Sequence, residues 1–284
     1  MVRRWWRLVL LMVALWQPLT VGADVVVHYP RPESDPDVRS HYARRLLELV
    51  LQRAYITYRL ELHPVRMQQG RAIARLKNGQ GIDVLSTMTS NEREQELLPI
   101  RIPIDKGLIG WRLLLINREQ AAKFSSVTSL DGLKNLTAGQ GHDWPDVHIL
   151  RENGLNVYDG TTNYVSLFSM LERQRIDYFP RSVTEAWSEA AQYQQRLMVE
   201  PSIVLRYPSA IYFFVRKGNE QLATDIREGL EKMIADGSFD KLFQEHFGDM
   251  IARSKLKERL VLDLNNPLMP SQMPVGRKNL WYHN

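Results

Sequence analysis

Short apolar runs alternate with amphipathic helical stretches along most of this chain, and that alternation restricts the fold more than any other feature. Strands are expected at residues 24–29, 55–62 and 82–86, with helical spacing between them at 42–50 and 72–76. A strand–helix–strand order of this kind indicates a mostly parallel sheet covered by helices. The expected fold class is therefore α/β.

The same order returns in the rest of the chain. An apolar strand at 113–116 precedes a helix that begins at Pro145 and ends before Gly154, which are the positions that proline and glycine prefer at helix termini. Residues 211–215 predict a further strand. Residues 219–236 predict the most regular helix, because its apolar side chains recur at steps of three and four.

The N-terminal residues have the pattern of a secretory signal peptide. Three arginines among the first seven residues precede an apolar run at 8–16, and small residues follow at 21–23. The run is shorter than the ~20 residues that a membrane-spanning helix needs. We therefore expect residues 1–23 to be removed and the mature protein to reside in the periplasm. Because the chain contains no cysteine, it offers no lipoprotein anchor, disulfide or thiolate metal site.

Size and charge restrict the class further. Without residues 1–23, the 284-residue chain retains 261 residues, which suits two lobes better than a single core. Removing the three arginines of the leader leaves 34 basic against 32 acidic side chains. The sequence also has no basic stripe with interleaved aromatic residues. Nucleic-acid binding is therefore not expected.

Four segments in the interior of the chain share their order and spacing with a known family. They are 81–84 with 88–93, 106–108 with 113–116, 129–133 with 139–141, and 211–215 with 229–230 and 236–239. Together they resemble the bacterial extracellular solute-binding proteins of family 3, the polar amino-acid type, over residues 24–250. That resemblance implies a two-lobed periplasmic-binding-protein fold of type II, with two crossover strands as its hinge.

The resemblance also implies how the chain divides. Residues 24–112 and 208–284 would form the first lobe and residues 113–207 the second, with the ligand in the cleft at the carboxyl ends of strands. The implied partners are a small-molecule ligand and a membrane permease. We expect a monomer that needs neither a metal nor a cofactor.

Arg93 is the first candidate for ligand binding. It stands where the family's arginine forks to a ligand carboxylate, a contact that suits the guanidinium geometry. Thr89 and Ser90 precede it and would donate hydroxyl hydrogen bonds to the same carboxylate. The alternatives are a surface arginine paired with neighbouring glutamates, and hydroxyls that cap the following helix.

A glycine-rich turn at 139–144 supplies the second set of candidates, Gln140, Gly141 and Trp144. The family uses this loop for ligand contacts, and a helix N-terminus after such a turn offers N–H groups to an anion. Trp144 is either a lid over the ligand or a wedge between the lobes. Tyr29, at the end of the first expected strand, is a further candidate or else a core residue.

Arg181 departs from the family's pattern. Amino-acid binders of the family carry an aspartate for the ligand's ammonium after the matching strand, where this chain has a cation. If Arg181 faces the cleft, a carboxylate-bearing or anionic solute is favoured. Otherwise Arg181 pairs with Glu185, one helical turn further on. The family's signature "G-[FY]-D-x-D" is also absent, because residues 30–37 take its place.

The leading hypothesis is a periplasmic protein that hands its solute to an uptake system. A ligand-loaded subunit of a membrane sensor is the second hypothesis, and a cleft enzyme of the dehydratase kind is the third. The sequence has no nucleophile elbow or phosphate-binding loop. His142, Asp143 and His148 lack the further ligand that a metal site needs. For the enzyme hypothesis, Asp143 is the candidate base.

Overall fold

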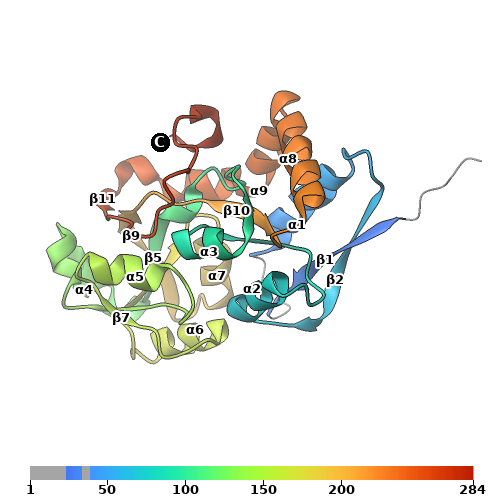
Figure 1. Ribbon diagram of the computed structural model, residues 1–284. Helices are drawn as coiled ribbons and strands as arrows, with labels where there is room; N and C mark the ends of the chain where they lie inside the picture. Colours follow the sequence, from blue (N-terminus) through green and yellow to red (C-terminus); the bar gives the residue numbers. More distant parts are fainter. Residues whose placement is uncertain (1–23, 34–38, 284) are drawn as a thin grey trace, which may run out of the picture.

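The computed structural model describes residues 24–33 and 39–283, so the expected signal peptide lies outside it. Two α/β lobes lie side by side (Figure 1). In the first lobe, β1 pairs in parallel with β2, and β10 runs antiparallel between β3 and β4. A backbone hydrogen bond from Asp83 to His28 places β1 beside β3. The strands of this lobe are β1 (Val25–Arg31), β2 (Tyr58–Arg66), β3 (Val84–Met88), β4 (Leu98–Ile100) and β10 (Ile211–Val215).

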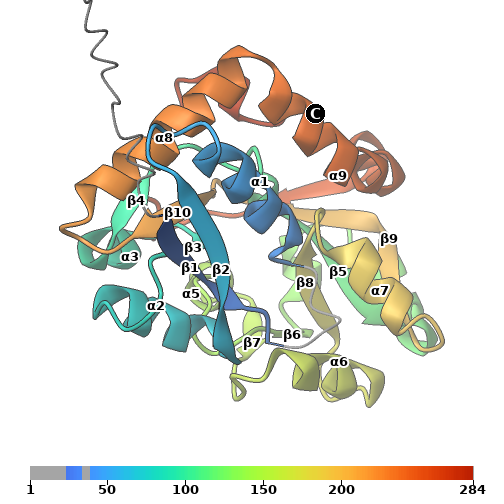
Figure 2. The ribbon, with the colours of Figure 1, turned by 90° about the vertical axis from the view of Figure 1, so that its right-hand side faces the viewer.

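Helices cover both faces of the first lobe (Figure 2). They are α1 (His41–Leu51), α2 (Gln69–Lys77), α3 (Asn91–Glu96), α8 (Glu220–Ala235) and α9 (Ser238–Ser254). The apolar face of α1, with Leu46 and Leu47, is fully buried. Helix α8 approaches α1 so closely at Gly229 that a Cβ there would lie 2.6 Å from the carbonyl oxygen of Val50. The helical periodicity of 219–236 thus corresponds to a packed helix.

The second lobe is built on a six-stranded sheet in the order β11-β9-β5-β8-β6-β7. Its strands are β5 (Trp111–Asn117), β6 (Thr137–Gly139), β7 (Asn156–Tyr158), β8 (Tyr178–Ser182), β9 (Leu197–Arg206) and β11 (Leu260–Asp263). Its helices are α4 (Ala122–Ser125), α5 (Asp146–Glu152), α6 (Tyr164–Glu172) and α7 (Ala186–Gln192). Every residue of β5 is buried, as the apolar run at 113–116 indicates.

The sheet of the second lobe is mixed, and the first lobe combines a parallel pair of strands with an antiparallel three-stranded sheet, whereas the sequence predicts mostly parallel sheets. The difference arises at the crossovers between the lobes. Strand β5 enters the second lobe antiparallel to β8 and β9, and β10 returns to the first lobe antiparallel to β3 and β4. Neighbouring strands are parallel when a crossover connection within one sheet joins them. A strand that arrives from the other lobe has no such connection, so it can pair in the antiparallel direction.

The C-terminal part of the chain corrects the expected division at residue 208. Strand β11 pairs in parallel with β9, so residues 260–263 belong to the sheet of the second lobe. Leu262 is buried there against the apolar side chains of that lobe. Strand β9 has one edge on β5 and would leave its other edge open without this partner. Residues 208–284 therefore serve both lobes.

A buried carboxylate fixes the hinge. Asp105, in the first crossover, accepts hydrogen bonds from the N–H groups of Gly107 (3.2 Å) and Ile109 (2.6 Å) and from Ile211 of the second crossover (3.3 Å). Burial raises the pKa of Asp105 to about 6, although these hydrogen bonds act in the opposite direction. One side chain thus ties both crossovers together.

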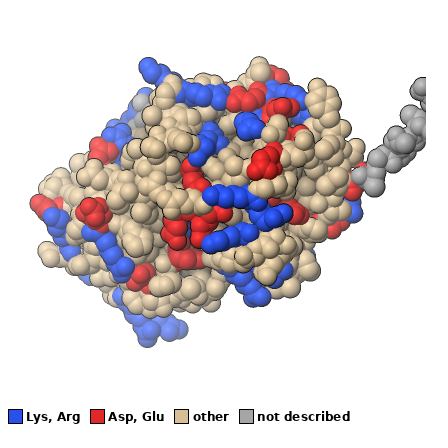
Figure 3. All heavy atoms as spheres, in the orientation of Figure 1, with Lys and Arg blue, Asp and Glu red and all other residues tan. Residues whose placement is uncertain are grey.

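The outer surface carries charges of both signs. Basic and acidic side chains are interspersed over the face in Figure 3, and neither sign forms a continuous stripe across it. Within residues 24–33 and 39–283, no helix is both long enough and apolar enough to cross a membrane.

Candidate functional site

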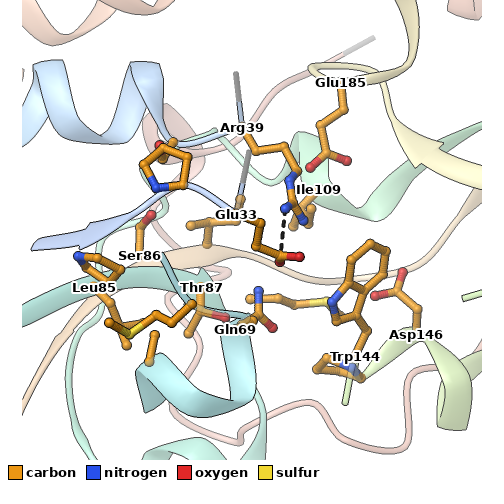
Figure 4. A pocket seen from close by; sticks show the side chains of 18 of the residues that line it. Glu33, Arg39, Gln69, Leu85, Ser86, Thr87, Ile109, Trp144, Asp146 and Glu185 are labelled. Atoms are coloured by element: carbon orange, nitrogen blue, oxygen red, sulfur yellow. Dashed lines mark hydrogen bonds and ion pairs between the residues drawn. The ribbon is translucent and has the colours of Figure 1, made fainter. Parts of the chain in front are cut away.

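A cavity of about 170 Å³ lies between the two lobes (Figure 4). That volume is similar to the ~150 Å³ cavity that accommodates a benzene-sized molecule. The hinge supplies Ile109 and Ile211 to its lining. The principal polar and aromatic lining residues are Tyr29, Arg31, Glu33, Arg39, Gln69, Ser86 and Thr87 from the first lobe, and Arg112, Trp144, Asp146, Arg181 and Glu185 from the second.

The wall from the first lobe carries the charged side chains of Arg31, Glu33 and Arg39 and a set of neutral hydrogen-bonding groups. One further arginine, Arg93, lies behind the neutral groups. The hydroxyl groups of Tyr29 and Ser86 are 2.6 Å apart. The guanidinium group of Arg93 donates to Thr87 Oγ1 (2.6 Å) and Gln69 Oε1 (2.8 Å), two side chains that line the cavity. Burial lowers the pKa of Arg93 to about 10, which leaves it cationic at neutral pH. Among the described residues, no carboxylate lies within 4 Å of its nitrogens.

Arg181 is the centre of the opposite wall. Its Nε lies 2.7 Å from Glu189 Oε2 and its terminal nitrogen 2.8 Å from Glu189 Oε1, so the contact is bidentate. The same guanidinium group lies 3.0 Å from Glu185. Burial acts to lower the pKa of Arg181, but the two glutamates outweigh it and raise the pKa. Glu189 also accepts the hydroxyl hydrogen bond of Tyr164 at 2.6 Å.

Arg112 extends this network of ion pairs toward α5. It lies 2.6 Å from Asp146 and 3.6 Å from Glu185, and its Nε donates to the hydroxyl oxygen of Tyr207 at 2.7 Å. The Tyr207 hydroxyl in turn donates to Asp146. Glu185 thus stands between two arginines. Its side chain, at 14% exposure, is more accessible than the other members of either pair, which are 2–4% exposed.

Aromatic rings connect this network to the first lobe. Trp144 stacks on Phe179, with ring centroids 6.2 Å apart, and the guanidinium carbon of Arg181 lies 5.0 Å from the Trp144 ring centre. Arg39 comes from the first lobe and pairs with Glu33 at 3.2 Å (Figure 4). Its guanidinium carbon lies 4.0 Å from the ring centre of Tyr164 in the second lobe. Cation–π contacts of this kind are stabilising, and this one crosses the cleft.

Two lobes, two hinge crossovers and a cavity between them that contains charged side chains define the architecture. The fold is that of a two-lobed solute-binding protein. An ancestral arginine-binding protein in complex with arginine superposes with a TM-score of 0.61 at 18% identity, over 80% of this chain and all of that one. A substrate-binding protein of an amino acid ABC transporter gives 0.58 at 14% identity, over 79% of this chain and 99% of that one.

A third similar structure is an ancestral amino-acid-binding protein that is a precursor of cyclohexadienyl dehydratase. Its TM-score is 0.58 at 16% identity, over 78% of this chain and 95% of that one. No protein-family model and no curated protein matches the sequence. At these identities the likeness establishes the binding-protein fold, and the expected two-lobed architecture is confirmed.

Three of the predicted site residues line the cavity of this binding-protein fold, namely Tyr29, Trp144 and Arg181. Trp144 lies under Arg181 and against Phe179, so its ring forms part of the second wall. For Arg181, both alternatives hold at once, because it lines the cavity and is also paired with Glu185 and Glu189. The positive charge of Arg181 is therefore neutralised by these two carboxylates.

The other five lie outside the lining. Arg93 is buried behind it, and Ser90 accepts a hydrogen bond from the Arg93 N–H at 3.2 Å as the N-cap of α3. Thr89 donates to Glu94 at 2.7 Å. Gly141 packs against the Trp144 ring, where a Cβ would lie 2.7 Å away. Gln140 is fully buried, and its side-chain amide has no hydrogen-bond partner among the described residues.

Sequence reasoning missed most of the charged lining. One signal was available for Arg112, since a charged residue at the start of a fully apolar strand needs a partner. Another was the spacing of Glu185 and Glu189, four and eight residues after Arg181, which places both at the start of the following helix. Gln69 and Thr87 carry no comparable signal.

Proposed function

We propose that this chain is a periplasmic solute-binding protein that captures a small, amino-acid-like solute and delivers it to a membrane permease. The observation that carries the proposal is the cavity between the two lobes, which has charged groups of both signs in its walls. Similar structures include an arginine-binding protein and a substrate-binding protein of an amino acid transporter. Bilobed proteins of this kind bind by closing around a ligand.

The charges in the two walls support a solute that carries both a carboxylate and a cationic group. Behind the first wall, the cation of Arg93 is satisfied only by neutral acceptors, so this side attracts a carboxylate. In the second wall, two arginines face three carboxylates, so that side has an excess of one negative charge. The purely anionic solute that Arg181 favours at the sequence level is not supported, because Arg181 is already neutralised.

The experiment is a thermal-shift screen followed by calorimetric titration of the best solute. A ligand in excess raises the melting temperature by mass action. We expect amino acids to stabilise the protein and dicarboxylates not to. Glu185→Gln should weaken binding of the amino acid at least ten-fold, since truncating one side of a desolvated charge pair costs ~2–5 kcal/mol and ~1.4 kcal/mol is a factor of ten.

Glu152→Gln is the matched control, because Glu152 is an exposed residue of α5 in the same lobe. It should leave affinity unchanged. A wild-type preference for dicarboxylates, or equal affinities of Glu185→Gln and wild type for an amino acid, would contradict the proposed charge pattern.

The geometry supports binding rather than catalysis. The carboxylates that line the cavity are Glu33, Asp146 and Glu185, and each is ion-paired to an arginine. Asp143, the candidate base, is not part of the lining. Because one similar structure is a precursor of a dehydratase, incubation of the protein with the solute found in the screen, followed by mass spectrometry, tests this point. We expect the solute to be recovered unchanged.

Export is tested separately. The signal-like pattern at residues 1–23 leads us to expect Asp24 as the first residue of the mature protein. Mass spectrometry of protein recovered from the periplasm measures this directly. An intact N-terminus retained in the membrane would exclude the periplasmic assignment.

A further inference from the structure

Asp143 joins the two lobes at the rim of the cavity. It belongs to the second lobe, immediately before Trp144, and its Oδ2 accepts a hydrogen bond from the Gly70 N–H in the first lobe at 2.6 Å. Its backbone oxygen accepts a second hydrogen bond from Arg93, also in the first lobe, at 3.2 Å. Both bonds cross the cleft, and both partners of each bond belong to the protein.

The Gly70 N–H lies in the first turn of α2, a helix with no cap of its own. Its N-cap residue, Gln68, makes no side-chain capping hydrogen bond, and its first turn contains no acidic residue. The N–H groups of a first helical turn have no partner within the helix, and a carboxylate placed there is stabilising. The second lobe therefore supplies the cap that the sequence of α2 lacks.

Glycine at position 70 makes the contact possible. A Cβ at Gly70 would lie 2.5 Å from Asp143 Oδ2, which is closer than the two atoms can approach. The neighbouring Gln69 points into the cavity and accepts from Arg93 (Figure 4). The rim contact and the first wall thus share a short stretch of chain, so the position of Asp143 affects the groups that meet a ligand.

We propose that Asp143 is a positioning residue for solute capture, which caps α2 from the opposite lobe and holds the lobes closed before any ligand arrives. The link to solute capture rests on the function proposed above, whereas the closure itself does not. A solute that binds only the closed state has an apparent affinity that is reduced by the fraction of molecules that are closed. Loss of an N-cap contact typically changes a folding equilibrium by roughly three- to thirty-fold, and we expect a change of that size in the ratio of closed to open molecules.

The first test measures closure in the absence of any solute. Because the chain has no cysteine, Ala74→Cys on α2 and Thr162→Cys near α6 provide one exposed labelling site on each lobe. Distances between two spin labels then report the closed and open populations. We expect the ligand-free protein to be mainly closed. Asp143→Ala and Gly70→Ala should each shift the ratio toward open by roughly three- to thirty-fold.

Two further variants and two controls separate the loss of this specific contact from general damage to the fold. Asp143→Asn keeps an acceptor oxygen and should remain closer to wild type than Asp143→Ala. The double variant Gly70→Ala/Asp143→Ala should open no further than either single variant, because both remove the same hydrogen bond. Asp131→Ala and Gly276→Ala are matched controls: Asp131 is an exposed residue of the second lobe, and a Cβ at Gly276 meets nothing within 4 Å. Both should leave the distances unchanged.

The outcomes are distinct. If the ligand-free wild type and Asp143→Ala show the same label distances, or if the two single effects add in the double variant, the proposal is wrong whatever the protein binds. If the variants reduce the closed fraction as expected and a solute is known, the affinity of the variants for that solute should fall by the same factor as the closed fraction. A screen that finds no solute while closure responds would count against the proposed function alone.

Discussion

The two walls of the cavity use opposite means to present polar groups to a ligand. In the second lobe, arginines and carboxylates are buried together and hold each other in place, as the bidentate contact of Arg181 with Glu189 shows. In the first lobe, the polar lining groups other than Arg31, Glu33 and Arg39 are neutral, and the cation of Arg93 lies behind Thr87 and Gln69. Buried ion pairs organise the second wall, whereas hydrogen bonds to neutral acceptors organise this part of the first wall.

Because of this difference, substitutions in the two walls should have unequal effects on the stability of the fold. A buried charge that loses its partner is strongly destabilising, so the carboxylates deep in the second wall maintain the fold. A neutral hydrogen bond contributes less to stability, so the groups of the first wall can be altered with smaller damage to the fold. Glu185 is the exception in the second wall, because it is shared by two arginines and is partly accessible.

The largest loss of stability is expected for a substitution in the second wall. Glu189→Ala removes the bidentate partner of Arg181 and the acceptor of the Tyr164 hydroxyl. We expect a loss of about 3–5 kcal/mol in the free energy of unfolding, measured in urea. Replacing both partners with apolar residues, as in Arg181→Met/Glu189→Leu, should restore most of that loss. A loss below about 1 kcal/mol, as for an exposed pair such as Arg277–Glu231, would remove the distinction between the walls.

A smaller loss of stability is expected for a substitution in the first wall. Thr87→Val removes the oxygen that accepts from Arg93 at 2.6 Å and keeps the shape of the side chain. We expect a loss of about 1–3 kcal/mol in the same urea experiment, because one N–H of a buried cation is left unsatisfied. Thr87→Ser keeps the hydroxyl and serves as the control. If Thr87→Val were as damaging as Glu189→Ala, the two walls would be equivalent.

The smallest effect concerns the hinge between the walls and depends on pH. The pKa of Asp105 is raised from 3.8 to about 6, so the folded state binds a proton more tightly than the unfolded state. Its contribution to stability is therefore fully present below about pH 4 and is lost as the pH rises through about 6. Between pH 7 and pH 5 the wild type should gain about 1 kcal/mol relative to Asp105→Asn, which does not titrate there. Parallel curves of unfolding free energy against pH would contradict this.

The fold followed from the sequence because it depends on local patterns. Apolar periodicity placed β1, β3, β5 and β10 near their observed positions, and the spacing at 219–236 placed α8. The antiparallel crossovers and the return of β11 to the second sheet were not predictable, since each depends on which strand edge remains open after the rest has assembled.

The site was less predictable for a related reason. Arg181 and its glutamates are close in sequence, so their pairing was open to prediction. Arg112 and Asp146 are brought together only because β5 and the start of α5 meet in the tertiary fold. The motif placed Arg93 near the cleft, but only the structure shows that four hydrogen bonds to protein acceptors hold it behind the lining.

The pairing of β11 with β9 has a consequence for the order in which the sheets can be completed. The two sheets of the first lobe have all their strands within residues 25–215, whereas the sheet of the second lobe also needs residues 260–263. Until then β9 presents an open edge, the kind of edge that pairs with other chains and aggregates. A fragment cut at residues 113–207 would keep that edge permanently, so the second lobe is a sequence-discontinuous unit whose sheet is completed by the C-terminal part of the chain.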